Sequence, residues 1–268
     1  MAETPRADGP GRTALVTGAS RGIGYELTRL FASDGYDVVL VARSRERLER
    51  VGAELEDAHG VTATVVPQDL STPGAAAALH ETVSEEGIRV DALVNNAAFG
   101  TYGRFVETAP ERDRELIRLN LLTVTELTKL FAREMVERGE GEVLNVSSLA
   151  GVLPVPRAAV YAAVKSYLLS FSVAVADELE ADGVTVSVLC PRETDTDILE
   201  RGGVENSALP EKDLLDPAAV ARSGYEGVRE GRTVVVPGGL REKLLHRLPG
   251  LLPETVAAST ARRYFEEE

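Results

Sequence analysis

Short apolar runs alternate with longer amphipathic stretches along nearly the whole chain. Short, continuous runs rich in valine, leucine and alanine predict buried strands when turn residues bound them. These runs cover residues 12–16, 37–42, 61–66, 91–94, 142–146, 184–189 and 233–236. The stretches between them repeat apolar residues at helical spacing, and they predict helices over residues 25–32, 45–59, 73–86, 110–137, 217–230 and within 156–181.

This alternation of strands and helices predicts an α/β fold. Helices between consecutive strands are typical of a parallel sheet, so we expect a Rossmann-like doubly wound sheet of about seven strands with helices on both faces, a three-layer αβα arrangement. No repeat, low-complexity linker or composition break divides residues 1–268, which predicts a single domain. Residues 1–10 predict a flexible leader and residues 239–268 a helical tail.

The charge balance excludes some classes of partner. The net charge is −14, and only four of the 29 basic residues are lysine. An acidic surface of this kind disfavours nucleic acid as a partner. Two explanations of the lysine-poor, acidic composition stay open. One is adaptation to a high-salt cytoplasm, and the other is a GC-rich genome in which arginine codons replace lysine codons.

Other compositional features point to an intracellular protein. A single cysteine excludes an intramolecular disulfide, and three scattered histidines give no metal-ligand spacing. Residues 1–10 lack the apolar core of a signal peptide, and no stretch approaches the ~18 apolar residues that span a membrane. We therefore expect a cytoplasmic protein.

Several leucines lie at positions 240–252, with arginine and lysine nearby. We interpret them as residues that pack on the protein or contact another copy of the chain, rather than as a membrane-surface contact.

A glycine-rich turn follows the first predicted strand, within residues 17–24. It leads directly into the first predicted helix, whose N-terminus offers free backbone N–H groups and a positive dipole end. Glycine allows a tight turn there and a close approach to a pyrophosphate. The turn contains three glycines and three other residues that we expect to contact a dinucleotide: Gly18, Ser20, Arg21, Gly22, Ile23 and Gly24.

Polar or special residues follow each of the first six predicted strands. Ligands of doubly wound sheets bind beyond the carboxyl ends of the strands, so these positions predict one site. After the glycine turn they are Arg43, residues 68–70, residues 95–98, residues 147–148 and residues 191–196.

Tyr161 and Lys165 are the strongest sign of catalysis. Residues four apart share one face of a helix, so the two side chains point the same way. A tyrosine has an ordinary pKa near ~10, and a fixed ammonium nearby favours the phenolate and lowers that pKa. The pair then passes a proton to or from a carbonyl or alcohol oxygen. Ser148 follows the fifth predicted strand, and its hydroxyl is placed to bind the same oxygen.

Together these motifs resemble the short-chain dehydrogenase/reductase family over nearly the whole chain. The resemblance implies an NAD(P)(H)-dependent oxidoreductase with Tyr161 as general acid/base and Ser148 as the anchor of the substrate oxygen. Lys165 would tune Tyr161 and bind the nicotinamide ribose, and Asn120 would hold a water that feeds protons through Lys165. The implied cofactor contacts are Gly18, Ser20, Arg21, Gly22, Ile23, Gly24, Arg43, Asp69, Leu70, Asn96, Ala97, Tyr161, Lys165, Pro191, Thr194 and Thr196.

Within this set, the resemblance assigns Asp69 to the adenine, Asn96 to the backbone on the adenosine side, and Thr196 to the nicotinamide amide. It also implies a substrate lid over residues 197–216. The helix from residue 110 and the helix that carries Tyr161 resemble the two helices through which the family self-associates. We therefore expect a homodimer or homotetramer.

Two positions depart from the family pattern. Ala98 stands where the family usually has glycine, and a methyl group there is tolerable. Arg192 follows Pro191 where the family favours glycine. Arginine resists positive φ and fills the space through which a glycine backbone would approach the cofactor. This departure bears on cofactor affinity and leaves the serine, tyrosine, lysine and asparagine set intact.

The second predicted strand ends at Arg43, with no acid at its tip. An acid there accepts hydrogen bonds from the ribose hydroxyls of NAD, whereas an arginine accommodates the 2′-phosphate of NADP. Arg21 approaches the same ribose from the glycine turn, and Glu46, the nearest acid, lies one turn into the next helix. The sequence therefore predicts NADP(H) as the preferred cofactor, with NAD(H) as the alternative.

The substrate is less specified than the cofactor. Residues 99–103 and 149–155 are rich in small and apolar residues and predict an apolar pocket. They favour a hydrophobic ketone or aldehyde as substrate, or the corresponding alcohol in the reverse reaction.

The alternative function is that of a dinucleotide-binding regulator or scaffold that has lost its catalytic activity, which only Arg192 favours. A third reading is a sugar-nucleotide epimerase or dehydratase, whose glycine motif has a different spacing and whose chain is longer.

Overall fold

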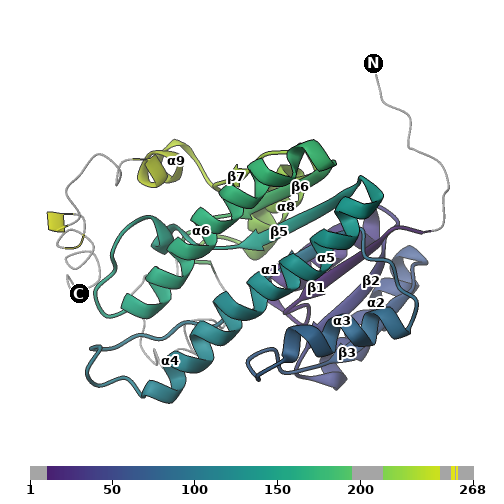
Figure 1. Ribbon diagram of the computed structural model, residues 1–268, viewed down its shortest axis with the longest axis horizontal. Coiled ribbons are helices and arrows are strands. Elements are labelled where there is room, and N and C mark those ends of the chain that lie inside the picture. Colours follow the sequence, from purple (N-terminus) through teal and green to yellow (C-terminus); the bar gives the residue numbers. More distant parts are fainter. Residues whose placement is uncertain (1–10, 195–213, 248–254, 257, 259–268) are drawn as a thin grey trace.

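A parallel sheet forms the centre of the protein, as a computed structural model shows for residues 11–194, 214–247, 255, 256 and 258 (Figure 1). The strand order is β3-β2-β1-β4-β5-β6-β7, and every pair of neighbours is parallel. This confirms the predicted Rossmann-like fold. The strands are β1 (Thr13–Thr17), β2 (Asp37–Ala42), β3 (Ala63–Pro67), β4 (Ala92–Asn95), β5 (Gly141–Val146), β6 (Val184–Leu189) and β7 (Val234–Val235).

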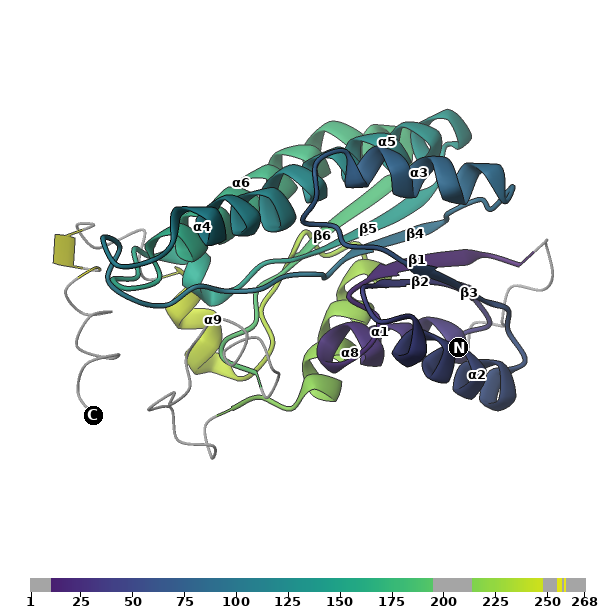
Figure 2. The same ribbon diagram turned by 90° about the horizontal axis from the view of Figure 1, so that it is seen from below.

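Helices cover both faces of the sheet, as Figure 2 shows in side view. Neighbouring residues of a strand point to opposite faces, so Val38 and Leu40 pack on one side of β2 while Val39 and Val41 pack on the other. The first side is covered by α1 (Gly22–Ser33), α2 (Arg45–His59) and α8 (Pro217–Arg229). The second side is covered by α3 (Ala75–Glu85), α5 (Val124–Arg138) and α6 (Ala159–Leu179).

The helix predicted over residues 110–137 is interrupted by a π-helical segment. The structure has three consecutive elements there: α4 (Pro110–Ile117), the π-helix η1 (Arg118–Thr123) and α5. A π-helical turn has i→i+5 hydrogen bonds, and it shifts the faces of the helix on either side relative to each other. Asn120 and Thr123 are buried in this segment.

Helix α6 is more apolar than the sequence led us to expect. Together with the short η3 helix (Glu180–Asp182) it spans Ala159–Asp182, and a window of this span has a mean hydropathy of 1.5. By length and composition alone it qualifies as a membrane-spanning helix, so the expectation of no such stretch was wrong. Core helices pass the same test, and one face of α6 packs on β6. Tyr167 and Val173 lie exposed on the helix.

Two short elements complete the carboxyl end of the sheet. The 3-10 helix η2 (Leu149–Val152) follows β5, and α9 (Leu240–Arg247) follows β7 and packs against η2. The predicted leader, residues 1–10, lies outside the described residues, as do residues 197–213 of the predicted lid and most of the tail beyond α9. The end of the lid segment is described: Leu215 forms a parallel bridge with Thr194.

Candidate active site

The glycine turn between β1 and α1 is fastened to the loop after β4. Thr17 at the end of β1 accepts hydrogen bonds on Oγ1 from the backbone N–H groups of Asn96 and Ala97, at 2.9 and 3.0 Å. The Asn96 side-chain amide donates back to the carbonyl oxygen of Thr17 at 2.9 Å. The two loops therefore form one rigid floor at the carboxyl end of the sheet.

Glycine is required at two positions of this floor. Gly18 has φ +71, and a Cβ there would lie 2.6 Å from the Asn96 amide nitrogen. A Cβ on Gly24 would lie 2.4 Å from the carbonyl oxygen of Gly18. Real Cβ atoms do not approach other atoms this closely, so the packing of the turn against α1 and Asn96 depends on the missing side chains.

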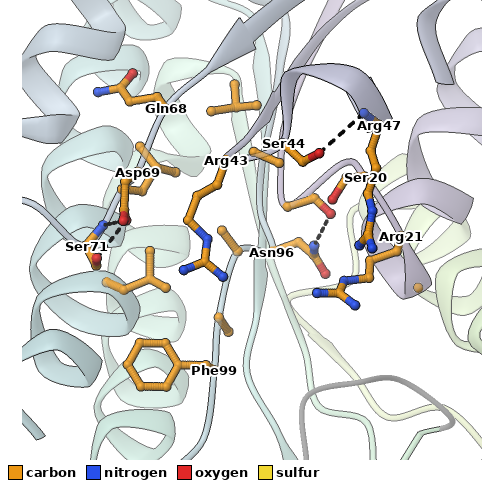
Figure 3. A pocket seen from close by; sticks show the side chains of 18 of the residues that line it. Ser20, Arg21, Arg43, Ser44, Arg47, Gln68, Asp69, Ser71, Asn96 and Phe99 are labelled. Carbon is orange, nitrogen blue, oxygen red and sulfur yellow. Dashed lines mark hydrogen bonds between the residues drawn. The ribbon is translucent and has the colours of Figure 1, made fainter. Parts of the chain in front are cut away.

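A pocket of about 660 Å³ opens beside this floor (Figure 3). Most of the predicted cofactor residues line it, drawn from the turn after β1 and from the ends of β2, β3 and β4. They are Gly18, Ser20, Arg21, Gly22, Ile23, Arg43, Asp69, Leu70, Asn96 and Ala97. Pocket volumes of about 300–1,000 Å³ hold small molecules and cofactors, so the pocket suits part of a dinucleotide.

Several lining residues were not predicted as cofactor contacts. Ser44, Arg47 and Ser71 lie close to predicted contacts, and they could have been found by extending each strand end by a few residues. Gln68 stood in the predicted stretch 68–70 but had no contact assigned to it. Arg112, Glu115 and Leu119 line the pocket without having been predicted, together with Phe99, which the sequence placed in an apolar substrate pocket. The Arg112 guanidinium lies 4.0 Å from the centre of the Phe99 ring, a cation–π contact between α4 and the loop after β4 that no local pattern announces.

Four arginines and two carboxylates line the pocket, namely Arg21, Arg43, Arg47, Arg112, Asp69 and Glu115. Arg21, Arg43 and Arg47 are directed toward it from the glycine turn, the end of β2 and α2 (Figure 3). Asp69 accepts hydrogen bonds on Oδ1 from the backbone and hydroxyl of Ser71, at 2.9 and 2.6 Å. Burial raises the pKa of Asp69, but these bonds and the charge of Arg43 outweigh it and hold the pKa below its ordinary value. Asp69 is therefore ionised at neutral pH.

Ser148, Tyr161 and Lys165 come together next to the ends of β5 and β6. The Ser148 side chain forms a hydrogen bond with the phenol of Tyr161, and the Lys165 ammonium lies 5.7 Å from the centre of the tyrosine ring. Lys165 Nζ donates to the carbonyl oxygen of Val146 at 2.8 Å, and the side chain is almost fully buried. Gly100 lies beside the ring, and a Cβ there would make only an ordinary van der Waals contact with Tyr161 Cδ2 at 3.6 Å.

Burial dominates the acid–base properties of this cluster. It raises the pKa of Tyr161 to about 12. The hydrogen bond with Ser148 lowers this pKa, whereas the charge of Glu193 raises it further. Burial also lowers the pKa of Lys165 to about 8. The expected lowering of the tyrosine pKa by Lys165 does not occur in this structure, because desolvation of the phenolate is the larger effect.

The Asn120 side chain is hydrogen-bonded to the loop after β4. Its side-chain nitrogen donates to the carbonyl oxygen of Phe99 at 2.9 Å, and its side-chain oxygen accepts from the Phe99 N–H at 3.4 Å. The amide thus ties the π-helical segment to the loop after β4. Its role in holding a water stays a prediction.

The remaining predicted cofactor residues lie apart from the lining of the pocket. Gly24 is buried beneath the turn, and Tyr161, Lys165, Pro191 and Thr194 belong to the neighbouring β5–β6 end. The Pro191 carbonyl accepts hydrogen bonds from Leu149 N at 2.8 Å and Ser148 Oγ at 3.4 Å. Thr196 lies outside the described residues.

The fold and the site together define a class of NAD(P)-dependent oxidoreductases that act on CH–OH groups. This class has a doubly wound parallel sheet, a glycine turn after the first strand, and a paired tyrosine and lysine. The model of the short chain dehydrogenase family matches residues 12–205. The chain belongs to the short-chain dehydrogenase/reductase family.

Individual relatives agree with this placement. Ketoacyl reductase HetN of Nostoc sp. is 35% identical over 181 residues, 68% of this chain and 63% of that protein, so the match leaves more than a third of the relative uncovered. The 7beta-hydroxysteroid dehydrogenase of Collinsella aerofaciens is 31% identical over 238 residues, 87% of this chain and 88% of that protein. The solved short-chain dehydrogenase from Sphingobium yanoikuyae in complex with NADPH has a TM-score of 0.82 and 31% identity, and the match covers 96% of this chain and 95% of that chain.

Proposed function

We propose that this protein is an NADP(H)-dependent oxidoreductase that interconverts a hydrophobic ketone or aldehyde and its alcohol. The observation that carries the proposal is the convergence of Ser148, Tyr161 and Lys165 at the carboxyl end of the sheet. The dinucleotide, when bound, supplies the hydride. The chain's own residues bind it, orient the substrate and move the proton.

The pocket fits the adenosine half of this cofactor. The backbone of the glycine turn offers N–H groups to the pyrophosphate, and Asn96 and Ala97 form the floor. Arg21, Arg43 and Arg47 bring positive charge where a 2′-phosphate would lie, and guanidinium groups bind phosphate through charge-assisted hydrogen bonds. This supports the preference for NADP(H), and the solved relative from Sphingobium is a complex with NADPH.

Tyr161 carries the proton in this mechanism. With its pKa raised to about 12, the phenol is protonated at neutral pH and donates to the oxygen of a carbonyl substrate as that oxygen becomes an alcohol. Ser148 binds the same oxygen and holds it beside the phenol. Lys165 holds its ammonium 5.7 Å from the centre of the ring, where a positive charge opposes the larger effect of burial on the phenolate that remains.

The hydrophobic substrate is supported by the walls around the cluster. Phe99 in the loop after β4 and Val155 in the loop after η2 are both buried. Helix η2 adds small and apolar residues directly after Ser148. The names of two relatives, a ketoacyl reductase and a 7beta-hydroxysteroid dehydrogenase, describe enzymes of extended apolar compounds. We further propose that the enzyme works in the cytoplasm.

Tyrosine substitution tests the proposal. Tyr161→Phe removes only the proton-transfer group, so kcat for reduction of a bulky aryl ketone by NADPH should fall by about 10²–10⁴ while NADPH binding is retained. Ser148→Ala should lose about 10²–10³ in kcat. The measurements are steady-state kinetics and NADPH titration by fluorescence.

Tyr167→Phe is the matched control for this test. Tyr167 lies on the same helix, is exposed, and shares a hydrogen bond with Thr125 at 3.0 Å. Its variant should keep wild-type kinetics. A Tyr161→Phe enzyme with wild-type kcat would show that the proton comes from another group.

A further inference from the structure

Arg192 makes an ion pair with a helix far away in the sequence. Its Nε lies 3.5 Å from Oε1 of Glu242 on α9, and the two side chains are 20% and 11% exposed. In the described part of the chain, most arginine–glutamate pairs lie at the surface within one helix, such as Arg45 with Glu49. The Arg192–Glu242 pair instead joins the loop after β6 to α9 and is shielded from water on most sides.

Glu242 has a second attachment that fixes its direction. Its Oε2 accepts a hydrogen bond from the backbone N–H of Gly239 at 2.8 Å, which caps the start of α9. Gly238, with φ +105, leaves the space that the glutamate fills, since a Cβ there would lie 2.8 Å from Glu242 Cγ. One carboxylate therefore holds both the first turn of α9 and the guanidinium of Arg192.

The loop that carries Arg192 also holds the loop of the catalytic serine. The carbonyl of Pro191, the preceding residue, accepts hydrogen bonds from Ser148 Oγ and Leu149 N. On the other side of Arg192, the Glu193 carbonyl accepts from Leu215 N at 2.9 Å. Residues 191–194 thus connect the Ser148 loop, α9 and the segment before α8 at one point.

Helix α9 lies next to the loop of the catalytic serine. It packs against η2, whose N-cap is Ser148, and Figure 2 shows it at the carboxyl end of the sheet together with α4. The pocket for the adenosine half of the cofactor is lined by the ends of β1 to β4 and by residues of α2 and α4, and its lining residues include none from α9 or η2. A shift of α9 would therefore change the space beside Ser148 and leave the adenosine pocket unaltered.

We propose that Arg192 and Glu242 are positioning residues that hold α9 against the Ser148 loop, so that α9 forms a wall of the substrate site and determines how well a bulky ketone binds. The proposal rests on the function proposed above. A partly buried ion pair is costly to break from one side only, because the remaining charge loses its partner in a poorly solvated place. Removing either charge should release α9.

Hydrogen–deuterium exchange tests the structural half of the proposal without relying on activity. In the full-length protein, Arg192→Gln and Glu242→Gln should each speed backbone exchange in α9 and η2 by about tenfold, because local opening governs exchange. The double variant should exchange no faster than the singles, since both remove the same contact. Glu242→Gln keeps an oxygen that can accept from Gly239 N, so the loss reports on the charge pair.

Steady-state kinetics tests the functional half. KM for a bulky aryl ketone should rise by about tenfold in both variants, while kcat and KM for NADPH stay within about twofold. Arg232→Gln is the matched control, because Arg232 pairs at 2.9 Å with Glu230 on the exposed surface, and it should change neither readout.

Unchanged exchange in α9 and η2 in both variants would overturn the pairing role. Faster exchange with an unchanged ketone KM, or with a change confined to NADPH, would overturn the role of α9 as a substrate wall. A wild-type protein that binds NADPH and turns over no carbonyl compound would contradict the proposed function, and with it the kinetic half, while the exchange result would still decide whether the pair holds α9.

Discussion

Arg43 shows how a single residue at a strand end can choose between two cofactors. It stands at the tip of β2, lines the pocket, and acts electrostatically on Asp69 across that pocket. Arg21 and Arg47 line the same pocket, so the 2′-phosphate of NADP would meet several guanidinium groups. With NAD, which lacks this phosphate, the same groups would have no anion to bind.

The Arg43→Asp variant tests this reading of the pocket. It removes an attraction and adds a repulsion, so the ratio of kcat/KM for NADPH to that for NADH should fall by about 100-fold. Arg50→Asp, on the helix that follows, is the control, because Arg50 is exposed, pairs at 3.8 Å with Glu46 and does not line the pocket. A wild-type preference for NADH, or a ratio that Arg43→Asp leaves unchanged, would contradict the assignment.

At the scale of one element, α1 depends on glycine more than on its own helix propensity. Its first residues, Gly22 and Gly24, are poor helix formers, and Arg21 at the N-cap makes no side-chain capping bond. The helix is stabilised by packing instead: Leu27 and Phe31 are fully buried, and α1 contacts α8, β1 and β2. The unsatisfied N–H groups at its start remain available to a pyrophosphate.

Gly24→Ala should therefore be costly although alanine is the better helix former. The new methyl would lie 2.4 Å from the Gly18 carbonyl oxygen, and we expect overpacking to lower the free energy of unfolding by about 3 kcal/mol. The displaced turn should also weaken NADPH binding. Chemical denaturation and NADPH titration measure the two effects.

Gly60→Ala is the control for this substitution. Gly60 ends α2 with φ +70, and a Cβ there would meet nothing within 4 Å, so only the left-handed backbone opposes the change. The expected loss is about 1 kcal/mol with unaltered NADPH binding. Equal losses in the two variants would mean that the turn relaxes around the methyl.

At the scale of the whole molecule, one side of the protein carries an apolar surface without a partner in the described part of the chain. Ile117 and Leu122 on the α4–η1 helix and Tyr167 and Val173 on α6 are between 36% and 47% exposed. Helix α6 contacts α4 and η1, so these residues belong to one neighbourhood. Clustered exposed apolar residues mark interaction surfaces, and we propose that this face joins copies of the chain into a dimer or tetramer.

Light scattering of the purified protein tests this assembly. The wild type should have the mass of a dimer or tetramer at micromolar concentration, because interfaces of about 1,600 Å² are stable there. The double variant Leu122→Arg/Val173→Arg should shift the mass toward that of the monomer. Ala53→Arg, on the exposed side of α2 and the opposite face of the sheet, should leave it unchanged. A monomeric wild type would contradict the proposal.

The sequence by itself determined the strand–helix alternation, the glycine turn and the Tyr161–Lys165 pair. These features are local, because strand period, helix period and the spacing of four residues act within one or two turns of the chain. It also predicted which residues gather at the carboxyl ends of the strands, since parallel strands bring their ends to the same edge. Of those pocket residues, Arg43, Asp69 and Asn96 lie where the pattern placed them.

Only the tertiary structure decided the features that depend on distant contacts and burial. The π-helical segment at Asn120, the Arg112–Phe99 contact and the Arg192–Glu242 pair join residues that no periodicity relates. The pKa of Tyr161 went against the sequence-based expectation for the same reason. The nearby ammonium was visible in the spacing, but the loss of water around the phenol, which raises the pKa to about 12, arises only when the surrounding loops close over it.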